Sequence, residues 1–174
     1  QKEILQLLAL TCARIGDVCA MKWADIDLNA KTWIFEPQKG KNRADMVDSL
    51  IVPLAPQTIA ILEQVHDITG GMEYVFYTGK RKNAPYADRQ QINKALNDPS
   101  MNKAKIGKDY CGRGYLEVHS PHGFRASAKT MLMERLGYSH LITEIQSGRS
   151  MPDAYGNTYN RMEAIKERVK MMNE

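Results

Sequence analysis

Apolar residues return every three or four positions in several stretches of the chain, which is the period of an α-helix with one buried face. The first stretch covers residues 3–13, and a longer one begins at Ser120-Pro121 and stops at Gly137. In the longer stretch, the apolar stripe expected to face the core is Phe124, Ala128, Met131, Leu132 and Leu136. Further helices are predicted from Asp17 to Trp23, from Pro56 to about His66, from Asp88 to Leu96, and at 140–147, 153–158 and 161–172.

Two shorter stretches interrupt the helical period and favour β-strands. Residues 32–35 and 49–54 are rich in β-branched and aromatic side chains, and a polar, lysine-rich segment separates them. This arrangement predicts a small antiparallel sheet with the basic segment near its turn. Residues 97–118 are polar and glycine-bearing, and they are expected to form a loop with some helical character. The predicted fold class is therefore mixed α/β, mostly α-helical with a small antiparallel β-sheet.

A length of 174 residues is enough for one well-buried domain and short for two. The chain opens on Gln1 without an initiator methionine, so it is expected to be a fragment of a longer parent protein. No run approaches the roughly 18 apolar residues of a membrane span. Cys12, Cys19 and Cys111 include no CxxC pair, which favours a reduced, cytoplasmic protein with buried or inert thiols. The four histidines are not spaced with these cysteines as ligand pairs, so no metal site is expected.

The net charge of +4 is compatible with a polyanionic partner but does not require one. The basic residues, however, gather in three loop-like segments, where positive charge can reach a phosphate backbone. The alternative is that each segment is simply a solvated loop. The three clusters are Lys39, Lys41 and Arg43, then Lys80, Arg81 and Lys82, then Lys103, Lys105, Lys108 and Arg113.

Four polar features follow one another along the chain. Arg14 stands at a break after the first helix with Asp17 three residues on, and Lys39 and Lys41 lie between the two predicted strands. His122-Gly123-Phe124-Arg125 opens a helix, and Thr158-Tyr159-Asn160-Arg161 places a tyrosine between two predicted helices. Each feature alone has an ordinary structural explanation, such as an ion pair, a helix cap or a packed ring.

In this order and spacing, the features resemble the catalytic domain of the tyrosine recombinases, particularly the prophage-type integrases. That family places an Arg in a T-G-x-R-x-G-E-like motif, then a hairpin Lys, then H-x-x-R, then a His or Trp, then a nucleophilic Tyr. The resemblance runs from Leu7 to Met172 and is most specific at residues 120–127, where H-G-F-R opens a helix. Tyr159-Asn160-Arg161 is similar to the end motif of the prophage branch.

The resemblance implies metal-free cleavage and rejoining of double-stranded DNA, without a cofactor, through a 3′-phosphotyrosine at Tyr159. Tyr155 is the alternative nucleophile. Arg14 and Arg125 would clamp the non-bridging phosphate oxygens, because guanidinium groups stay charged and offer forked donors. Asp17 would hold Arg14 in place or cap the second helix.

The remaining roles also follow from the resemblance. Lys39 would protonate the leaving 5′ oxygen, with Lys41 as the alternative, and His122 would bind the scissile phosphate or relay the tyrosine proton. Arg149 occupies the position where the family has a His or Trp. An arginine there could still donate a hydrogen bond to phosphate, or the change could weaken the enzyme. The residues expected to contact DNA outside the catalytic centre are Lys41, Arg43, Lys80, Arg81 and Lys82.

The implied partners are double-stranded DNA attachment sites, further copies of the protein in a synaptic tetramer, host DNA-bending proteins and an excisionase. The expected setting is the bacterial cytoplasm, at the nucleoid, in a prophage or genomic island. Residues 1–174 would form the catalytic domain, and N-terminal DNA-binding domains would belong to the parent protein. The C-terminal helix could self-associate or pack on its own core through Ile165, Val169 and Met172.

Three other functions compete with this interpretation. A type IB topoisomerase would use similar residues to relax supercoils, but the H-G-F-R and Tyr-Asn-Arg contexts favour an integrase. A non-catalytic DNA-binding module of integrase origin would retain the fold without the reaction. An unrelated α-rich domain could contact RNA or a protein through its basic loops. In that case, the order of the four motifs would be a coincidence.

Overall fold

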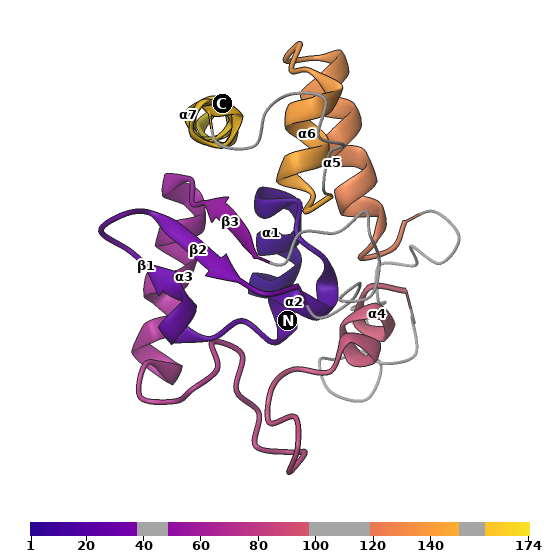
Figure 1. The fold of residues 1–174 in the computed structure, drawn as a ribbon. Helices are drawn as coiled ribbons and strands as arrows, with labels where there is room; N and C mark the ends of the chain where they lie inside the picture. The colour runs from indigo at the N-terminus through magenta and orange to yellow at the C-terminus, as the bar shows by residue number, and fades with distance from the viewer. Residues whose placement is uncertain (38–48, 98–118, 150–158) are drawn as a thin grey trace.

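The fold is built around a three-stranded antiparallel sheet of order β1-β2-β3 (Figure 1). The structure, a computed structural model, describes residues 1–37, 49–97, 119–149 and 159–174. The strands are β1 (Ile26–Asp27), β2 (Thr32–Phe35) and β3 (Leu50–Pro53). The helices are α1 (Lys2–Thr11), α2 (Ile15–Cys19), the 3-10 helix η1 (Trp23–Asp25), α3 (Pro56–Thr69), α4 (Arg89–Asn97), α5 (Gly123–Glu134), α6 (His140–Gln146) and α7 (Tyr159–Asn173). The predicted fold class, mostly helical with a small antiparallel sheet, is confirmed.

The sheet follows the alternation of side chains along its strands. Trp33 pairs with Val52 in the register of β2 and β3, and both side chains are buried, while Ile34 and Ile51 pair on the exposed face. Successive side chains of a strand point to opposite faces, so one face joins the core. The two predicted strands are therefore confirmed. The short strand β1 was not predicted, because two residues carry no periodic signal.

The buried apolar residues form two clusters. The larger one joins α1, α2, the sheet, α3 and α4, and includes Leu7, Trp33 and Leu62. The smaller one joins α6 and α7 through Ile142, Ala164 and Met171, with Leu132 of α5 packed against them. In Figure 1, α5 and α6 run side by side above α1, and α7 lies above β3. The second cluster thus forms a separate layer over the first.

Buried polar side chains join these two layers. Gln146 at the end of α6 donates from Nε2 to the Thr11 carbonyl at 2.9 Å and accepts from Arg168 Nε at 2.8 Å. Arg168 also donates to the Ile51 carbonyl of β3, and its side chain is only 4% exposed. Burial lowers the pKa of Arg168 to about 10, so its guanidinium remains charged at neutral pH. This network holds α7 against α6, β3 and the end of α1.

Several details of the predicted helices are wrong. Arg14, not Asp17, is the N-cap of α2, and Asp17 lies buried in its first turn; α2 ends at Cys19, before Trp23. Met131 and Leu136 were placed in the apolar stripe of α5 but are 53% and 45% exposed. The periodicity identified the helix but predicted too wide a buried face, because the small α6–α7 layer covers only part of the apolar stripe of α5.

The C-terminal helix also differs from its prediction. It begins at Tyr159 itself, so this tyrosine opens α7 rather than lying between two helices. Its buried face is formed by Ala164, Arg168 and Met171, while Val169 is 42% exposed. A charged residue was not expected to occupy the inner face. The helix predicted at 153–158 and the loop at 97–118 fall almost entirely outside the described residues.

Two of the three thiols are buried, as predicted. Cys12 and Cys19 are free, and burial raises their pKa values to about 11 and about 12. Cys111 lies outside the described residues. Among the described residues, no helix has both the length and the apolar character to cross a membrane.

Replacing Gln146 with leucine should destabilise the protein strongly. The change keeps the side-chain volume but leaves the buried Arg168 Nε and the Thr11 carbonyl without a hydrogen-bond partner. The expected loss is about 2–4 kcal/mol in the free energy of unfolding, measured by urea titration. Gln57→Leu, at an exposed position of α3, is the matched control and should stay within about 0.5 kcal/mol. A loss below about 1 kcal/mol for the Gln146 variant would contradict this account.

The buried thiols should resist modification in the native state. In a Cys111→Ser variant at pH 8, a pKa of about 11 leaves roughly one Cys12 thiol in a thousand ionised, and Cys19 fewer still. An aromatic disulfide reagent should therefore release at least about ten-fold less product per minute from folded protein than from protein in urea. Rapid reaction of the folded variant would show that these thiols are accessible.

Candidate active site

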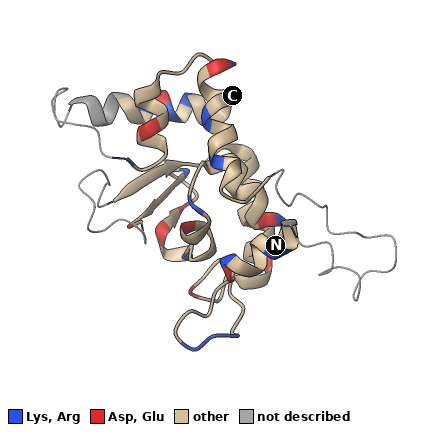
Figure 2. Cartoon of the chain, turned by 90° about the vertical axis from the view of Figure 1, so that its right-hand side faces the viewer, with Lys and Arg blue, Asp and Glu red and all other residues tan. Residues whose placement is uncertain are grey.

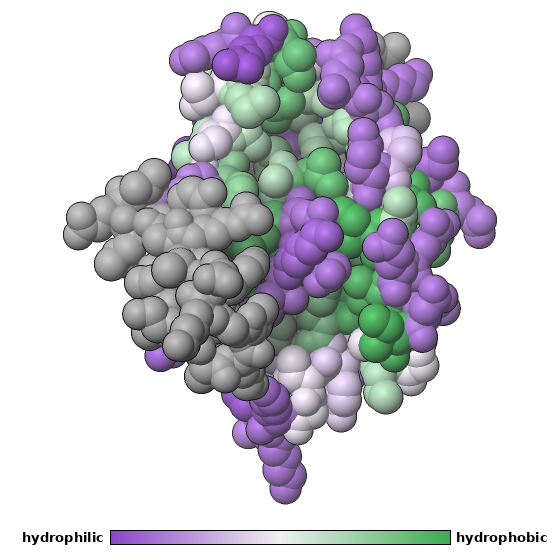
Figure 3. Space-filling view, turned by 180° about the vertical axis from the view of Figure 1, so that it is seen from behind, coloured by the Kyte–Doolittle hydropathy of each residue, from purple (hydrophilic) through white to green (hydrophobic). Residues whose placement is uncertain are grey.

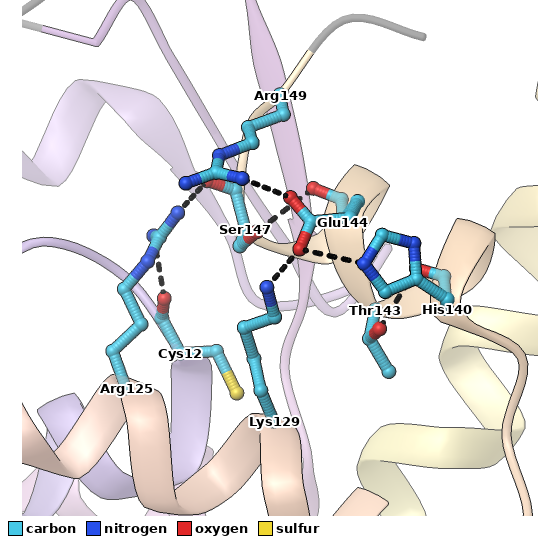
Figure 4. Close-up of polar contacts among 8 residues, drawn as sticks. All are labelled: Cys12, Arg125, Lys129, His140, Thr143, Glu144, Ser147 and Arg149. Atoms are coloured by element: carbon cyan, nitrogen blue, oxygen red, sulfur yellow. Dashed lines mark hydrogen bonds and ion pairs between the residues drawn. The ribbon is translucent and has the colours of Figure 1, made fainter. Parts of the chain in front are cut away.

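Three arginines from distant parts of the chain converge on the turn that follows α6. Arg125 donates from NH2 to the carbonyl of Ser147, the first residue of that turn (Figure 4). Arg14 NH1 lies 3.6 Å from the position that a Cβ at Gly148 would occupy. Arg149 is the next residue of the same turn. The structure therefore brings together the three arginines that the sequence motifs singled out.

Arg125 is the innermost of the three cations. It lies in the first turn of α5 and is 9% exposed, and its NH1 donates to the Cys12 carbonyl at 2.9 Å. Among the described residues, its hydrogen-bond partners are this carbonyl and that of Ser147. Burial, and next the nearby charge of Arg14, lower the pKa of Arg125 to about 10. Arg125 therefore stays charged at neutral pH, and its carbonyl partners leave its net charge in place.

Arg14 reaches this turn because the chain reverses at the end of α1. Cys12 adopts a left-handed conformation with φ 57°, which ends α1 and directs the chain into α2 with Arg14 as its N-cap. Gly148 has φ +70°, and a Cβ there would meet Leu50 Cδ2 at 3.1 Å. Only glycine combines this backbone conformation with so close an approach. Two local backbone features thus place Arg14 beside Gly148, the residue that precedes Arg149.

Arg149 is held by a buried carboxylate that sequence reasoning missed. Its NH1 lies 3.0 Å from Glu144 Oε2, and its backbone N–H donates to the Glu144 carbonyl at 3.2 Å. Glu144 Oε1 accepts from Lys129 Nζ and lies 3.5 Å from His140 Nε2. Burial, and next the charge of Arg149, lower the pKa of Lys129. Helical spacing offered one signal, because Lys129 stands four residues after Arg125 and hence on the same face of α5.

Two histidines lie near the start of α5. His122 is the N-cap of the helix and is exposed, and the structure describes no contact between its side chain and the three arginines. His119 packs edge-on against Phe124 at 4.4 Å between ring centroids. Within the described part of the chain, its buried Nε2 has no hydrogen-bond partner. The helix opens at the H-G-F-R motif as predicted, and the predicted role of His122 stays a prediction.

Asp17 lies inside α2, three residues after Arg14, and is buried. Its negative charge acts on the site, since it raises the pKa of Arg125 against the effect of burial. Its predicted part in holding Arg14 stays a prediction. As an acid beside several cations, it limits their mutual repulsion.

Several predicted site residues lie outside the described residues. Lys39, Lys41 and Arg43 belong to the segment between β2 and β3, and Tyr155 precedes α7. For Tyr159, the structure describes the backbone at the first residue of α7 but not the side chain. The sheet therefore carries the predicted general acid on the link between its two longer strands, and α7 carries the predicted nucleophile at its start.

The basic residues 80–82 lie apart from the three arginines, on the loop between α3 and α4. This loop carries a blue basic tip in Figure 2, and the tip stands out as a hydrophilic projection in Figure 3. Arg81 lies 3.6 Å from Asp88 and packs over the ring of Tyr86. Lys80 and Lys82 are exposed. A second basic surface thus exists, at a distance from the turn after α6.

The chain is similar to curated proteins of Escherichia coli strain K12. Prophage integrase IntA is 26% identical over 163 residues, which cover 94% of this chain and 35% of IntA. Prophage integrase IntZ is 28% identical over 170 residues, which cover 98% of this chain and 37% of IntZ. The chain therefore spans little more than a third of the length of these relatives.

Solved structures share the fold over almost the whole chain. The crystal structure of XerA recombinase matches with a TM-score of 0.57 and 19% identity, covering 99% of this chain and 62% of that one. The Tn1549 transposon integrase, solved in complex with circular intermediate DNA, matches with a TM-score of 0.58 and 16% identity, covering 96% of this chain and 59% of that one. The phage integrase family matches residues 1–146. With most of its length matched, the chain belongs to the phage integrase family, the tyrosine recombinases.

Proposed function

We propose that residues 1–174 form the catalytic domain of a site-specific DNA recombinase that cuts and rejoins double-stranded DNA through Tyr159. The observation that carries the proposal is the convergence of Arg14, Arg125 and Arg149 on the turn after α6. The buried guanidinium of Arg125 is hydrogen-bonded to carbonyls and has other cations near it. Such a cluster is suited to bind an anion with two acceptor oxygens, such as a phosphodiester. Family membership supports DNA recombination as the general function.

The arginines supply the electrostatic part of the reaction. In the transition state of phosphoryl transfer, negative charge develops on the two non-bridging oxygens of the phosphate. Arg14 and Arg125 stabilise these oxygens with donors that are held in place before the substrate arrives, which lowers the barrier without reorganisation. Arg149 and the exposed His122 add donors at the edge of the site.

The covalent step transfers the phosphoryl group to the protein. The Tyr159 oxygen attacks phosphorus and loses its proton, with His122 as the relay, and the bond between phosphorus and the 5′ oxygen breaks. Lys39 donates a proton to the leaving 5′ oxygen. The product is a 3′-phosphotyrosine and a free 5′-hydroxyl, and attack by a 5′-hydroxyl of another strand reverses the step. The reaction needs no cofactor.

The anchoring of α7 through Arg168 supports Tyr159 over Tyr155 as the nucleophile. Tyr159 is the first residue of a helix whose body is tied to α6 and β3 by the buried Arg168. Arg168 lies about two and a half turns after the tyrosine. This anchor ties α7 to α6, which ends at the turn on which the three arginines converge.

The biological setting is proposed from the relatives. Two of them are named prophage integrases, which supports integration and excision of a prophage or genomic island. The substrate would then be a pair of attachment sites, bound by four copies of the protein with host DNA-bending proteins and an excisionase. The structure of Tn1549 integrase with DNA supports duplex DNA as the partner. The basic residues 80–82 and Lys41 and Arg43 would contact the phosphate backbone.

The covalent intermediate provides the direct test. The parent protein and a Tyr159→Phe variant are incubated without divalent metal with a nicked suicide duplex that carries the attachment site. A covalent protein–DNA band on a denaturing gel is expected for the wild type and not for the variant, because phenylalanine has no nucleophile. A band that persists in the variant assigns the nucleophile to Tyr155. Absence of the band in the wild type favours a DNA-binding module over an enzyme.

Arg125→Lys should impair cleavage even though the positive charge is kept. A lysine ammonium cannot reproduce two hydrogen bonds from separate nitrogens to the carbonyls of Cys12 and Ser147. The single-turnover rate constant for cleavage is expected to fall on the order of a hundred-fold. Arg135→Lys, at the exposed end of α5, is the control and should cleave like the wild type. An equal effect of the two substitutions would argue against a role for Arg125 in the reaction.

A further inference from the structure

We propose that Glu144 is a positioning residue for Arg149, and that Lys129 neutralises the Glu144 charge so that the site keeps its affinity for phosphate. The proposal rests on the proposed recombinase function and adds to it two residues outside the predicted set. It also gives a physical reason why an arginine can occupy the position where the family has a His or Trp.

Glu144 contacts Arg149 at two points, through a side-chain ion pair and a backbone hydrogen bond. The side chain of Arg149 is 56% exposed, and its NH1 lies 3.0 Å from the Glu144 carboxylate. Its backbone N–H donates to the carbonyl of the same residue. A histidine or tryptophan ring is short and stiff, whereas an arginine has a long, flexible stem. The contact with Glu144 supplies the missing rigidity, and the rest of the planar guanidinium remains available to an anion.

The carboxylate is an unusual group to find in a phosphate site. Its side chain is only 3% exposed, so solvent screens its charge poorly, and it would repel a nearby phosphate. Lys129 Nζ binds the other carboxylate oxygen, from the neighbouring helix α5 (Figure 4). Lys129 and Glu144 together carry no net charge. The positive charges of Arg14, Arg125 and Arg149 therefore remain effective toward DNA.

The contacts of Glu144 extend beyond its own helix. The residue lies in the last turn of α6, and its three cationic or titratable neighbours come from α5, from α6 itself and from the following turn. A carboxylate that only stabilised α6 would need none of the contacts to Lys129 and Arg149. The contact with Arg149 instead joins it to the residue that stands at the edge of the arginine cluster.

A double-mutant cycle with the parent protein and the suicide duplex separates positioning from folding. Glu144→Gln keeps the shape but removes the charge, and it should lower the cleavage rate constant about ten-fold to a hundred-fold. The dissociation constant for the duplex should change less than about three-fold, because bulk phosphate contacts remain. In an Arg149→Ala background, the same change should have little further effect. In an Arg149→His background, the rate should also be nearly independent of Glu144.

Lys129→Met tests the neutralising role. With Glu144 present, the uncovered carboxylate should slow cleavage about ten-fold. In the Glu144→Gln background, the lysine substitution should have almost no further effect, because no negative charge is left to balance. Glu134→Gln, at an exposed position of α5, is the matched control and should cleave like the wild type.

The outcomes distinguish this inference from the function on which it rests. A wild type that forms no covalent product refutes the proposed recombinase and the inference with it. A wild type that cleaves, with Glu144→Gln equally active, overturns the inference alone. Equal losses from Glu144→Gln in all three Arg149 backgrounds, together with a lower melting temperature, would also overturn it and assign Glu144 a structural role.

Discussion

The structure depends on burying two guanidinium groups between its two apolar layers. Arg125 is held by the carbonyls of Cys12 and Ser147, and Arg168 by the Gln146 amide and the Ile51 carbonyl. A buried charge is tolerated only where hydrogen bonds replace its hydration. The ends of α1, α6 and β3 must therefore meet with their carbonyl groups facing inward. This requirement fixes how the α5–α6–α7 layer sits on the sheet and α1.

The same constraint creates the site. Carbonyl groups satisfy the hydrogen bonds of Arg125 without cancelling its net charge, and burial, then the nearby charge of Arg14, lower its pKa. The repulsion among neighbouring arginines is an energetic cost in the free protein, and in the proposed function a bound phosphate would relieve it. Clustering the arginines thus lowers the stability of the free protein and raises its affinity for an anion. Such a conflict is common where a site is preorganised for its ligand.

Two buried acids, Glu144 and Asp17, reduce the repulsion among the cations. Asp17 is buried within α2, and its charge opposes the lowering of the Arg125 pKa that burial causes, while Glu144 is buried in α6 and contacts Lys129 and Arg149. Each acid makes the local cation density easier to maintain in the absence of DNA. The pairing of Glu144 with Lys129 has a further consequence, because it allows a carboxylate to orient Arg149 without weakening the attraction for phosphate.

The sequence by itself determined the elements and the order of the polar motifs. Runs rich in β-branched and aromatic residues predicted β2 and β3, helical spacing predicted α5 and α7, and the motif order led to Arg14, Arg125 and Arg149. Tertiary structure decided what periodicity cannot express: the inward position of Arg168, the exposure of Met131, and the contacts of Glu144. Two of the buried hydrogen bonds, Arg125 with Cys12 and Gln146 with Thr11, join residues more than a hundred positions apart. A periodic pattern reports which face of an element is apolar, whereas the partner of a buried polar group is set only when the layers meet.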